Sequence, residues 1–157
     1  MVGKYNNNKD AYHSVIKALE HAAVAVDRNL KIDWIEAANL GDANHESWEI
    51  LKKSHGVVVP GGFGERGLEG KIKAINYVRT QNVPFLGICL GMQASVIEYA
   101  RNVCSLPDSN SQEFSSKEGD AIIFMPEGDK EKMGGTMRLG SRATLLTEGS
   151  VAHQTYG

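Results

Sequence analysis

The sequence has few cysteines and no long hydrophobic run. Its 157 residues include two cysteines, Cys89 and Cys104, too few for the disulfide framework of a small secreted domain. No Cys-x-x-Cys pair occurs and the five histidines are scattered, so we expect no metal site. No apolar run approaches the roughly 18 residues that span a bilayer. The first residues are polar, unlike a signal peptide, and we expect a cytoplasmic protein.

An excess of charge of one sign is also lacking. The net charge is −2, which provides no basic field to attract nucleic acid or anionic lipid. With 41% hydrophobic and 23% charged residues, the composition is that of an ordinary globular protein. The length fits one domain on the usual range of roughly 100–200 residues. We therefore expect a single domain without a nucleic-acid or membrane partner.

Short hydrophobic runs alternate with helical spacing through the middle of the chain. The runs 56–60 and 83–88 predict strands buried on both faces, because they are apolar and bounded by turn residues. Helices are predicted after them, over 68–80 and 90–103. Strands that alternate with helices pair in parallel through right-handed crossovers. The predicted fold is therefore α/β, a flavodoxin-like, doubly wound, mostly parallel sheet.

Weaker patterns flank this region. A one-faced helix capped by Asp10, a strand over 30–36 and a short helix over 46–53 are expected before it. After Leu106 the pattern fades into a polar loop, with strands suggested near 121–124 and 136–146. No closing helix is predicted for 151–157.

The sharpest motif is Gly87-Ile88-Cys89-Leu90-Gly91-Met92-Gln93, at a predicted strand-to-helix junction. It matches the G-x-nucleophile-x-G turn, with cysteine as the nucleophile. Such a turn strains the nucleophile's backbone, and its glycines leave room for the neighbouring chain. The helix N-terminus favours the thiolate, and the N–H of Leu90 can point at a developing oxyanion. The motif therefore predicts nucleophilic catalysis by Cys89.

A glycine-rich loop, Pro60-Gly61-Gly62-Phe63-Gly64, follows the first of these two strands. In a parallel sheet the carboxyl ends of neighbouring strands face the same crevice. A glycine N–H of this loop can therefore supply a second oxyanion donor. The loop is neither a P-loop nor a dinucleotide fingerprint, because it lacks Gly-Lys-Ser/Thr and the required glycine spacing.

Four segments together resemble one family. PGGFGERG, PFLGICLGMQASVIEYARN, NSQEF and MGGTMRLGSR are similar to the glutaminase domains of CTP synthases, within the class I glutamine amidotransferases. The similarity runs from about Lys4 to the end of the chain. It implies the class I glutamine amidotransferase fold and hydrolysis of L-glutamine. It also implies that the ammonia passes to a synthetase domain, which aminates UTP to CTP at the expense of ATP.

The resemblance assigns roles to residues of these segments. It implies that Cys89 forms a glutamyl thioester and that the N–H groups of Gly62 and Leu90 form the oxyanion hole. A carboxylate such as Glu113, in NSQEF, suits the α-ammonium of glutamine. The substrate-binding residues that the resemblance implies are Gly62, Leu90, Gly91, Met92, Gln93 and Glu113.

The resemblance also implies partners. This domain needs no cofactor, whereas ATP and Mg²⁺ serve the synthetase domain, which would precede residue 1, and GTP activates the enzyme. A homotetramer is expected at full length. Phe63 is a hypothetical stacking residue for GTP, and Arg138 and Arg142 are weaker candidates for nucleotide or domain contacts. Cys104 is expected to be a small core residue.

One part of the family pattern is missing. A thiol nucleophile needs a histidine and an orienting carboxylate, which the family supplies as His-x-Glu near the C-terminus. No His-x-Glu occurs here, and four of the five histidines precede Cys89, at positions expected to be exposed or at the core edge. We therefore expect that residues 1–157 form one domain lacking its C-terminal part. Another class I amidotransferase, another cysteine hydrolase and a catalytically incomplete binding module remain alternatives.

Overall fold

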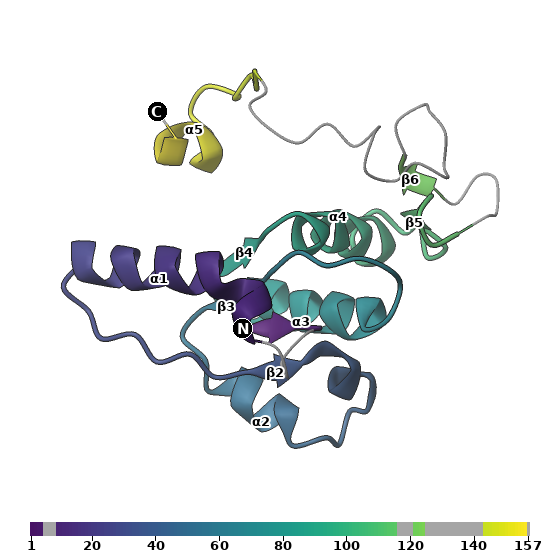
Figure 1. Ribbon diagram of the computed structural model, residues 1–157. Coiled ribbons are helices and arrows are strands. Elements are labelled where there is room, and N and C mark those ends of the chain that lie inside the picture. The colour runs from purple at the N-terminus through teal and green to yellow at the C-terminus, as the bar shows by residue number, and fades with distance from the viewer. Residues whose placement is uncertain (5–8, 116–120, 125–142, 157) are drawn as a thin grey trace. The chain divides into compact units, whose positions relative to one another are not determined.

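The computed structural model describes residues 1–4, 9–115, 121–124 and 143–156. It divides into two units, Met1–Phe124 and Met125–Gly157, each of which is described by itself. The first unit carries most of the helices and strands, which Figure 1 shows in purple to green. The second unit contributes one described helix, α5.

Every strand pair of the described chain is parallel. β3 pairs with β4 so that Val59 lies opposite Gly87, and β1 lies against β3. The paired strands are β1 (Val2–Gly3) with β2 (Ile35–Glu36), β3 (Val57–Val59) with β4 (Phe85–Gly87), and β5 (Asn110–Ser111) with β6 (Ala121–Ile123). The predicted parallel pairing is confirmed, and it places the segments that follow β3 and β4 at the same edge of the sheet.

Two amphipathic helices cover β3 and β4. α3 (Leu68–Thr80) has the predicted bounds, and α4 (Leu90–Asn102) ends one residue before the predicted end. They pack against each other, and α3 also packs on the 3₁₀ helix η2 (Ala37–Gly41). The shorter helices before β3 are η1 (Lys9–Tyr12), α1 (His13–Ala25) and α2 (Ser47–Lys52).

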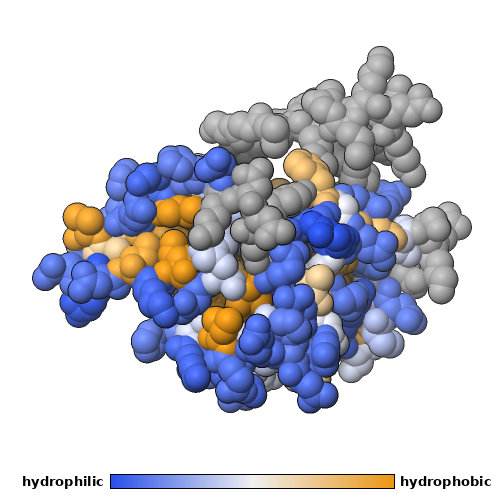
Figure 2. Space-filling model, turned by 60° about the horizontal axis from the view of Figure 1, so that its bottom comes forward, coloured by the Kyte–Doolittle hydropathy of each residue, from blue (hydrophilic) through white to orange (hydrophobic). Residues whose placement is uncertain are grey.

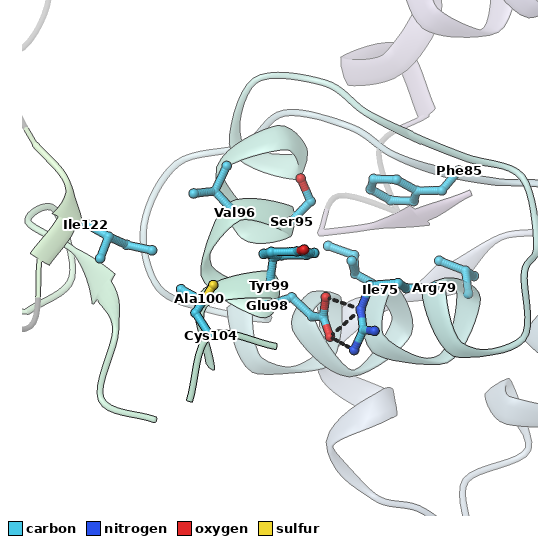
Figure 3. A pocket seen from close by; sticks show the side chains of 11 residues that line it. Ile75, Arg79, Phe85, Ser95, Val96, Glu98, Tyr99, Ala100, Cys104 and Ile122 are labelled. Atoms are coloured by element: carbon cyan, nitrogen blue, oxygen red, sulfur yellow. Dashed lines mark hydrogen bonds and ion pairs between the residues drawn. The ribbon is translucent and has the colours of Figure 1, made fainter. Parts of the chain in front are cut away.

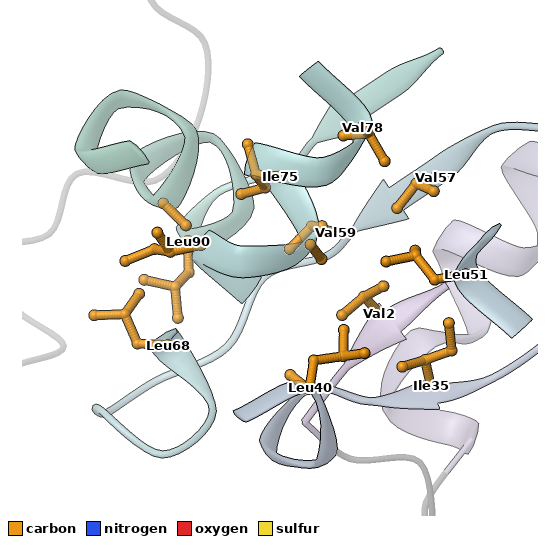
Figure 4. Close-up of a cluster of buried hydrophobic side chains, with 14 of the residues drawn as sticks. Val2, Ile35, Leu40, Leu51, Val57, Val59, Leu68, Ile75, Val78 and Leu90 are labelled. Atoms are coloured by element: carbon orange, nitrogen blue, oxygen red, sulfur yellow. The ribbon is translucent and has the colours of Figure 1, made fainter. Parts of the chain in front are cut away.

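One hydrophobic core joins these elements. Val57 and Val59 of β3 pack with Ile75 and Val78 of α3, and Leu90 begins α4 within the same cluster. Figure 4 shows these side chains converging with those of Val2, Ile35, Leu40, Leu51 and Leu68. The core therefore fixes the orientation of both segments that follow β3 and β4.

Several predicted positions are more exposed than expected. β4 was expected to be buried, yet Leu86 at its centre is 48% exposed. β4 pairs with β3 alone among the described strands, which leaves part of it uncovered. α1 buries no residue and begins at His13 without a side-chain cap, so the prediction of a cap by Asp10 is wrong. Figure 2 shows hydrophobic side chains exposed between hydrophilic ones on one face.

The C-terminal unit also differs from the expectation. Residues 151–156 form a helix, α5 (Val151–Tyr156), although no closing helix was predicted there. The stretch is short and polar, so its helical spacing gave no clear signal. Residues 143–146 are not a strand, and the rest of the strand suggested over 136–146 lies outside the described residues. The first unit agrees better, because β6 confirms the strand suggested near 121–124.

A buried ion pair ties α3 to α4. The side chain of Glu98 is 1% exposed, and its carboxylate accepts hydrogen bonds from Arg79 (2.8 Å) and Asn76 (2.8 Å). Figure 3 shows this pair at the wall of a cavity of about 670 Å³. Burial opposes ionisation of Glu98, but the hydrogen bonds from Arg79 and Asn76 outweigh it and lower the pKa of the carboxyl.

We expect Glu98→Gln to lower the free energy of unfolding at pH 7 by about 1–3 kcal/mol, since a charge-assisted pair is lost. The folded-state pKa is lowered, so this contribution is present above the unfolded glutamate pKa of about 4.3 and is lost as pH falls through the folded value. Urea unfolding from pH 7 to pH 2.5 should therefore show the two proteins converging in acid. Glu69→Gln, which removes an exposed partner of Arg101, is the control with a small effect. A difference that stayed constant down to pH 2.5 would contradict this assignment.

Candidate functional site

Cys89 occupies the turn between β4 and α4 with a strained backbone. It is the residue before α4, and its φ of 55° and ψ of −113° lie in a region that residues with a side chain rarely adopt. Its thiol is free and exposed. The chain thus presents a thiol at the N-terminus of a 13-residue helix, where partial positive charge favours an anion.

The two glycines that flank this turn are required by close backbone contacts. A Cβ on Gly91 would lie 1.9 Å from the carbonyl oxygen of Val59, and a Cβ on Gly87 would lie 2.7 Å from the carbonyl oxygen of Gly91. The same contact is held by hydrogen bonds from Ile88 N–H to Val59 O (3.0 Å) and from Gly91 N–H to Ile88 O (2.9 Å). The glycines of the motif therefore allow the close approach of backbone segments that the sequence predicted.

The glycine-rich loop after β3 lies alongside Cys89. A Cβ on Gly61 would lie 3.3 Å from Cys89 Cβ and 3.7 Å from its Sγ. The end of β1 holds this loop, because Lys4 Nζ donates to the carbonyl oxygen of Phe63 and Arg66 Nη2 donates to that of Lys4 (3.0 Å). The structure thus brings the two glycine motifs together at the carboxyl edge of β3 and β4.

The other candidate residues of the Cys89 motif lie in the first turn of α4. Leu90 and Gly91 are buried, Met92 is exposed and Gln93 is half-buried. The backbone N–H of Gln93 donates to Cys89 O (3.1 Å). Within the described ranges, no acceptor takes the N–H of Gly62 or of Leu90. Two backbone donors therefore remain near the thiol.

Glu113 reaches the glycine-rich loop from the segment after β5. Its Oε1 accepts a hydrogen bond from Gly64 N–H (3.2 Å), and its own N–H donates to Ser111 Oγ (3.3 Å). The carboxylate is half-buried. The Glu113 carboxylate therefore lies at the glycine-rich loop, which also contacts Cys89.

The remaining candidates are less well connected. Phe63 is 65% exposed, and its stacking role stays a prediction. Arg138 and Arg142 lie outside the described residues. Cys104 is exposed and lines the cavity of Figure 3, so its expected burial in the core is wrong. The sequence showed a small apolar residue near a helix end but not what would cover it.

The four histidines of the first unit lie apart from the hydrogen bonds of the Cys89 turn. His13 and His21 on α1 and His55 before β3 are exposed, and His45 is half-buried beside Ser47, which confirms the expectation for these four. His153 belongs to the other unit. Among the described residues of the first unit, no histidine hydrogen-bonds to Cys89, and no cluster of described side chains is arranged to hold a metal ion. No described helix is both long and apolar enough to cross a bilayer.

The sequence interpretation missed Lys71. It lies on the inward face of α3 with Leu68, Ile75 and Val78, and its side chain is completely buried. A lysine at an apolar position of the helical pattern was the available signal.

Known proteins resemble the chain along its whole length. The family model described as "Glutamine amidotransferase class-I" matches residues 8–156. CTP synthase of Dictyostelium discoideum is 55% identical over 94% of the chain, and CTP synthase 1 of Homo sapiens is 49% identical over all of it. The chain covers 27% and 28% of these two proteins, so it spans less than a third of their length.

A solved structure supports the same grouping. The glutaminase domain of Trypanosoma brucei CTPS with bound acivicin matches with a TM-score of 0.75 and 38% identity. The match covers 85% of this chain and 51% of that one. It confirms the predicted α/β fold, and with the family model it leads to one conclusion: the chain belongs to the class-I glutamine amidotransferase family.

Proposed function

We propose that this chain is the glutaminase domain of a CTP synthase and that it hydrolyses L-glutamine through a thioester on Cys89. The observation that carries the proposal is the strained Cys89 turn with the glycine-rich loop beside it. The family model and the relatives named CTP synthase support it. The bound acivicin of the related T. brucei structure is consistent with a glutamine-like ligand.

The proposed chemistry follows from the atoms at the turn. Cys89 Sγ, as a thiolate, attacks the side-chain amide carbon of glutamine, and the C–N bond breaks to release ammonia. The negative charge on the amide oxygen is stabilised by the N–H groups of Gly62 and Leu90. Water then cleaves the thioester to give glutamate. Protonation of the leaving ammonia requires a general acid, such as a histidine that has first taken up the thiol proton, and we assign that role to none of the residues above.

The substrate contacts are proposed on the same geometry. Glu113 would bind the α-ammonium group, because its carboxylate stands at the loop that passes Cys89. Gly91, Met92 and Gln93 would line the pocket from the first turn of α4. Neither role needs a cofactor in this domain.

The activity of the whole protein extends the proposal further. In the first relatives the matched part is less than a third of the protein, which leaves room for a synthetase domain before this one. That domain would use ATP and Mg²⁺ to aminate UTP, with GTP as activator and a homotetramer as the assembly. Both cysteines are free thiols, which suits a reducing compartment such as the cytoplasm.

Amination by two nitrogen donors tests this proposal. In the polypeptide that joins this domain to its synthetase domain, CTP formation should occur with glutamine or with ammonium salts. Cys89→Ala should abolish the glutamine-dependent reaction and leave the ammonia-dependent one intact. Cys104→Ala is the matched control and should affect neither. Glutamine-dependent CTP formation that survived Cys89→Ala would refute the thioester route.

Glu113→Gln should weaken glutamine binding by about 10–100-fold, because a charge-assisted hydrogen bond is worth about 1.5–3 kcal/mol. The measurement is the glutamine concentration that half-protects Cys89 from alkylation, which does not depend on turnover. Glu65→Gln, which changes an exposed acid directly after the glycine-rich loop, is the control. Equal protection in Glu113→Gln and the unmodified protein would remove Glu113 from the substrate site.

A further inference from the structure

Lys71 is a buried cation without a hydrogen-bond partner. Its exposed fraction is 0%, and within the described residues no acceptor lies within hydrogen-bonding distance of its Nζ. Buried ammonium groups are costly unless they are paired. A lysine that is buried without a partner near a nucleophilic turn is a candidate for a functional charge.

The start of the helix that carries Lys71 is packed closely against η2. A Cβ on Gly70 would lie 1.7 Å from Ala37 O, and one on Gly67 would lie 3.2 Å from Ala37 Cβ, so the first turns of α3 are pressed against η2. Helical side chains lean toward the helix N-terminus. That end of α3 follows the glycine-rich loop, so Lys71 extends toward the carboxyl edge of β3, where Cys89 lies.

Three groups on neighbouring segments act electrostatically on Lys71. Lys4 follows β1, Glu36 ends β2, and Cys89 precedes α4. Burial, and to a smaller extent Lys4, lower the pKa of Lys71, whereas Cys89 and Glu36 act in the opposite direction, and the net result is a pKa of about 8. The ammonium form therefore still predominates at pH 7, and electrostatic coupling between Cys89 and Lys71 favours a thiolate when Lys71 is charged.

We infer that Lys71 is a positioning residue of the Cys89 site: its buried, unpaired ammonium is a positive charge near the turn that favours the thiolate and the oxyanion formed by its attack. This role rests on the proposed function for the oxyanion, but its effect on the thiolate exists without glutamine. Lys4 is already engaged with the glycine-rich loop through Phe63 O. Lys71 is therefore the internal counter-charge to Cys89, and a neutral residue of equal length would remove it.

The test is the alkylation rate of Cys89 by iodoacetamide in the full chain, read by mass spectrometry. Lys71→Met should slow this reaction about tenfold at pH 7, because a nearby positive charge that favours the thiolate is removed. The rate ratio should approach one at pH 9.5, where Lys71 is largely neutral. Lys71→Arg should restore most of the rate. Lys73→Met, an exposed lysine on the same helix, is the matched control, and Cys104 is the internal reference thiol.

A purely structural role would give a different pattern. The folded-state pKa of Lys71 lies below its unfolded value, so the charge destabilises the fold below pH 8 and the penalty fades as pH rises toward 10. Lys71→Met should therefore unfold at the same or a higher urea concentration while Cys89 reacts more slowly. Slower Cys89 labelling together with a lower urea midpoint, or an unchanged rate, would overturn the inference. Loss of glutamine protection with the Lys71 effect intact would instead count against the proposed function alone.

Discussion

Cys89→Gly should abolish glutamine hydrolysis and at the same time make the protein more stable than Cys89→Ala. Both variants lose the thiol, but only glycine adopts a φ of 55° and ψ of −113° without strain. The expected difference in the free energy of unfolding is about 1–3 kcal/mol in favour of glycine. The strained backbone at Cys89 therefore lowers the free energy of unfolding while it presents the thiol.

Urea unfolding of the two variants measures this difference directly. Cys104 provides the matched comparison, because its φ is not positive among the described backbone angles. There, glycine should be about 0.4–1 kcal/mol less stable than alanine, because glycine gives the unfolded chain more conformational freedom. If Cys89→Gly were also less stable than Cys89→Ala, the turn would not be strained.

Gly91→Ala should be among the most destabilising single changes in the chain. The new Cβ would lie 1.9 Å from Val59 O, and the atom it meets is backbone, which cannot rotate away. We expect a loss of about 3 kcal/mol or more in the free energy of unfolding, because β3 and α4 must separate. Surviving folded protein should also lose the selective reactivity of Cys89, since the turn would move from the glycine-rich loop.

Gly41→Ala is the control for this prediction. Nothing lies within 4 Å of the position that its Cβ would take, and its φ is not positive. Its effect should be within about 0.5 kcal/mol, as for most surface changes. Urea midpoints of the two variants that agreed within error would contradict the close contact between Gly91 and β3.

The sequence was informative where a pattern repeats. The bounds of α3 and the start of α4 followed from apolar residues at helical spacing and from the glycines before each helix. Parallel pairing of β3 with β4 followed from the alternation of strands and helices. The approach of the two glycine motifs then required only that parallel strands share one edge.

Burial was harder to predict, because it depends on what covers a residue. Leu86 and Cys104 look like core residues in the sequence but are exposed in the described structure. Lys71 shows the opposite difference, because a lysine is expected at the surface and its side chain is completely buried. Contacts between distant segments, such as Gly64 with Glu113, carry no local pattern at all.

Glutamine-protected labelling of the two thiols tests the central claim most directly. A glutamine-like chloroketone is added to the full chain with and without L-glutamine, and each cysteine is followed by mass spectrometry. The account predicts fast modification of Cys89 that glutamine suppresses, while Cys104 reacts slowly and without protection. Slow, equal and unprotected labelling of both thiols would contradict it, because the Cys89 turn would then be present without a glutamine site.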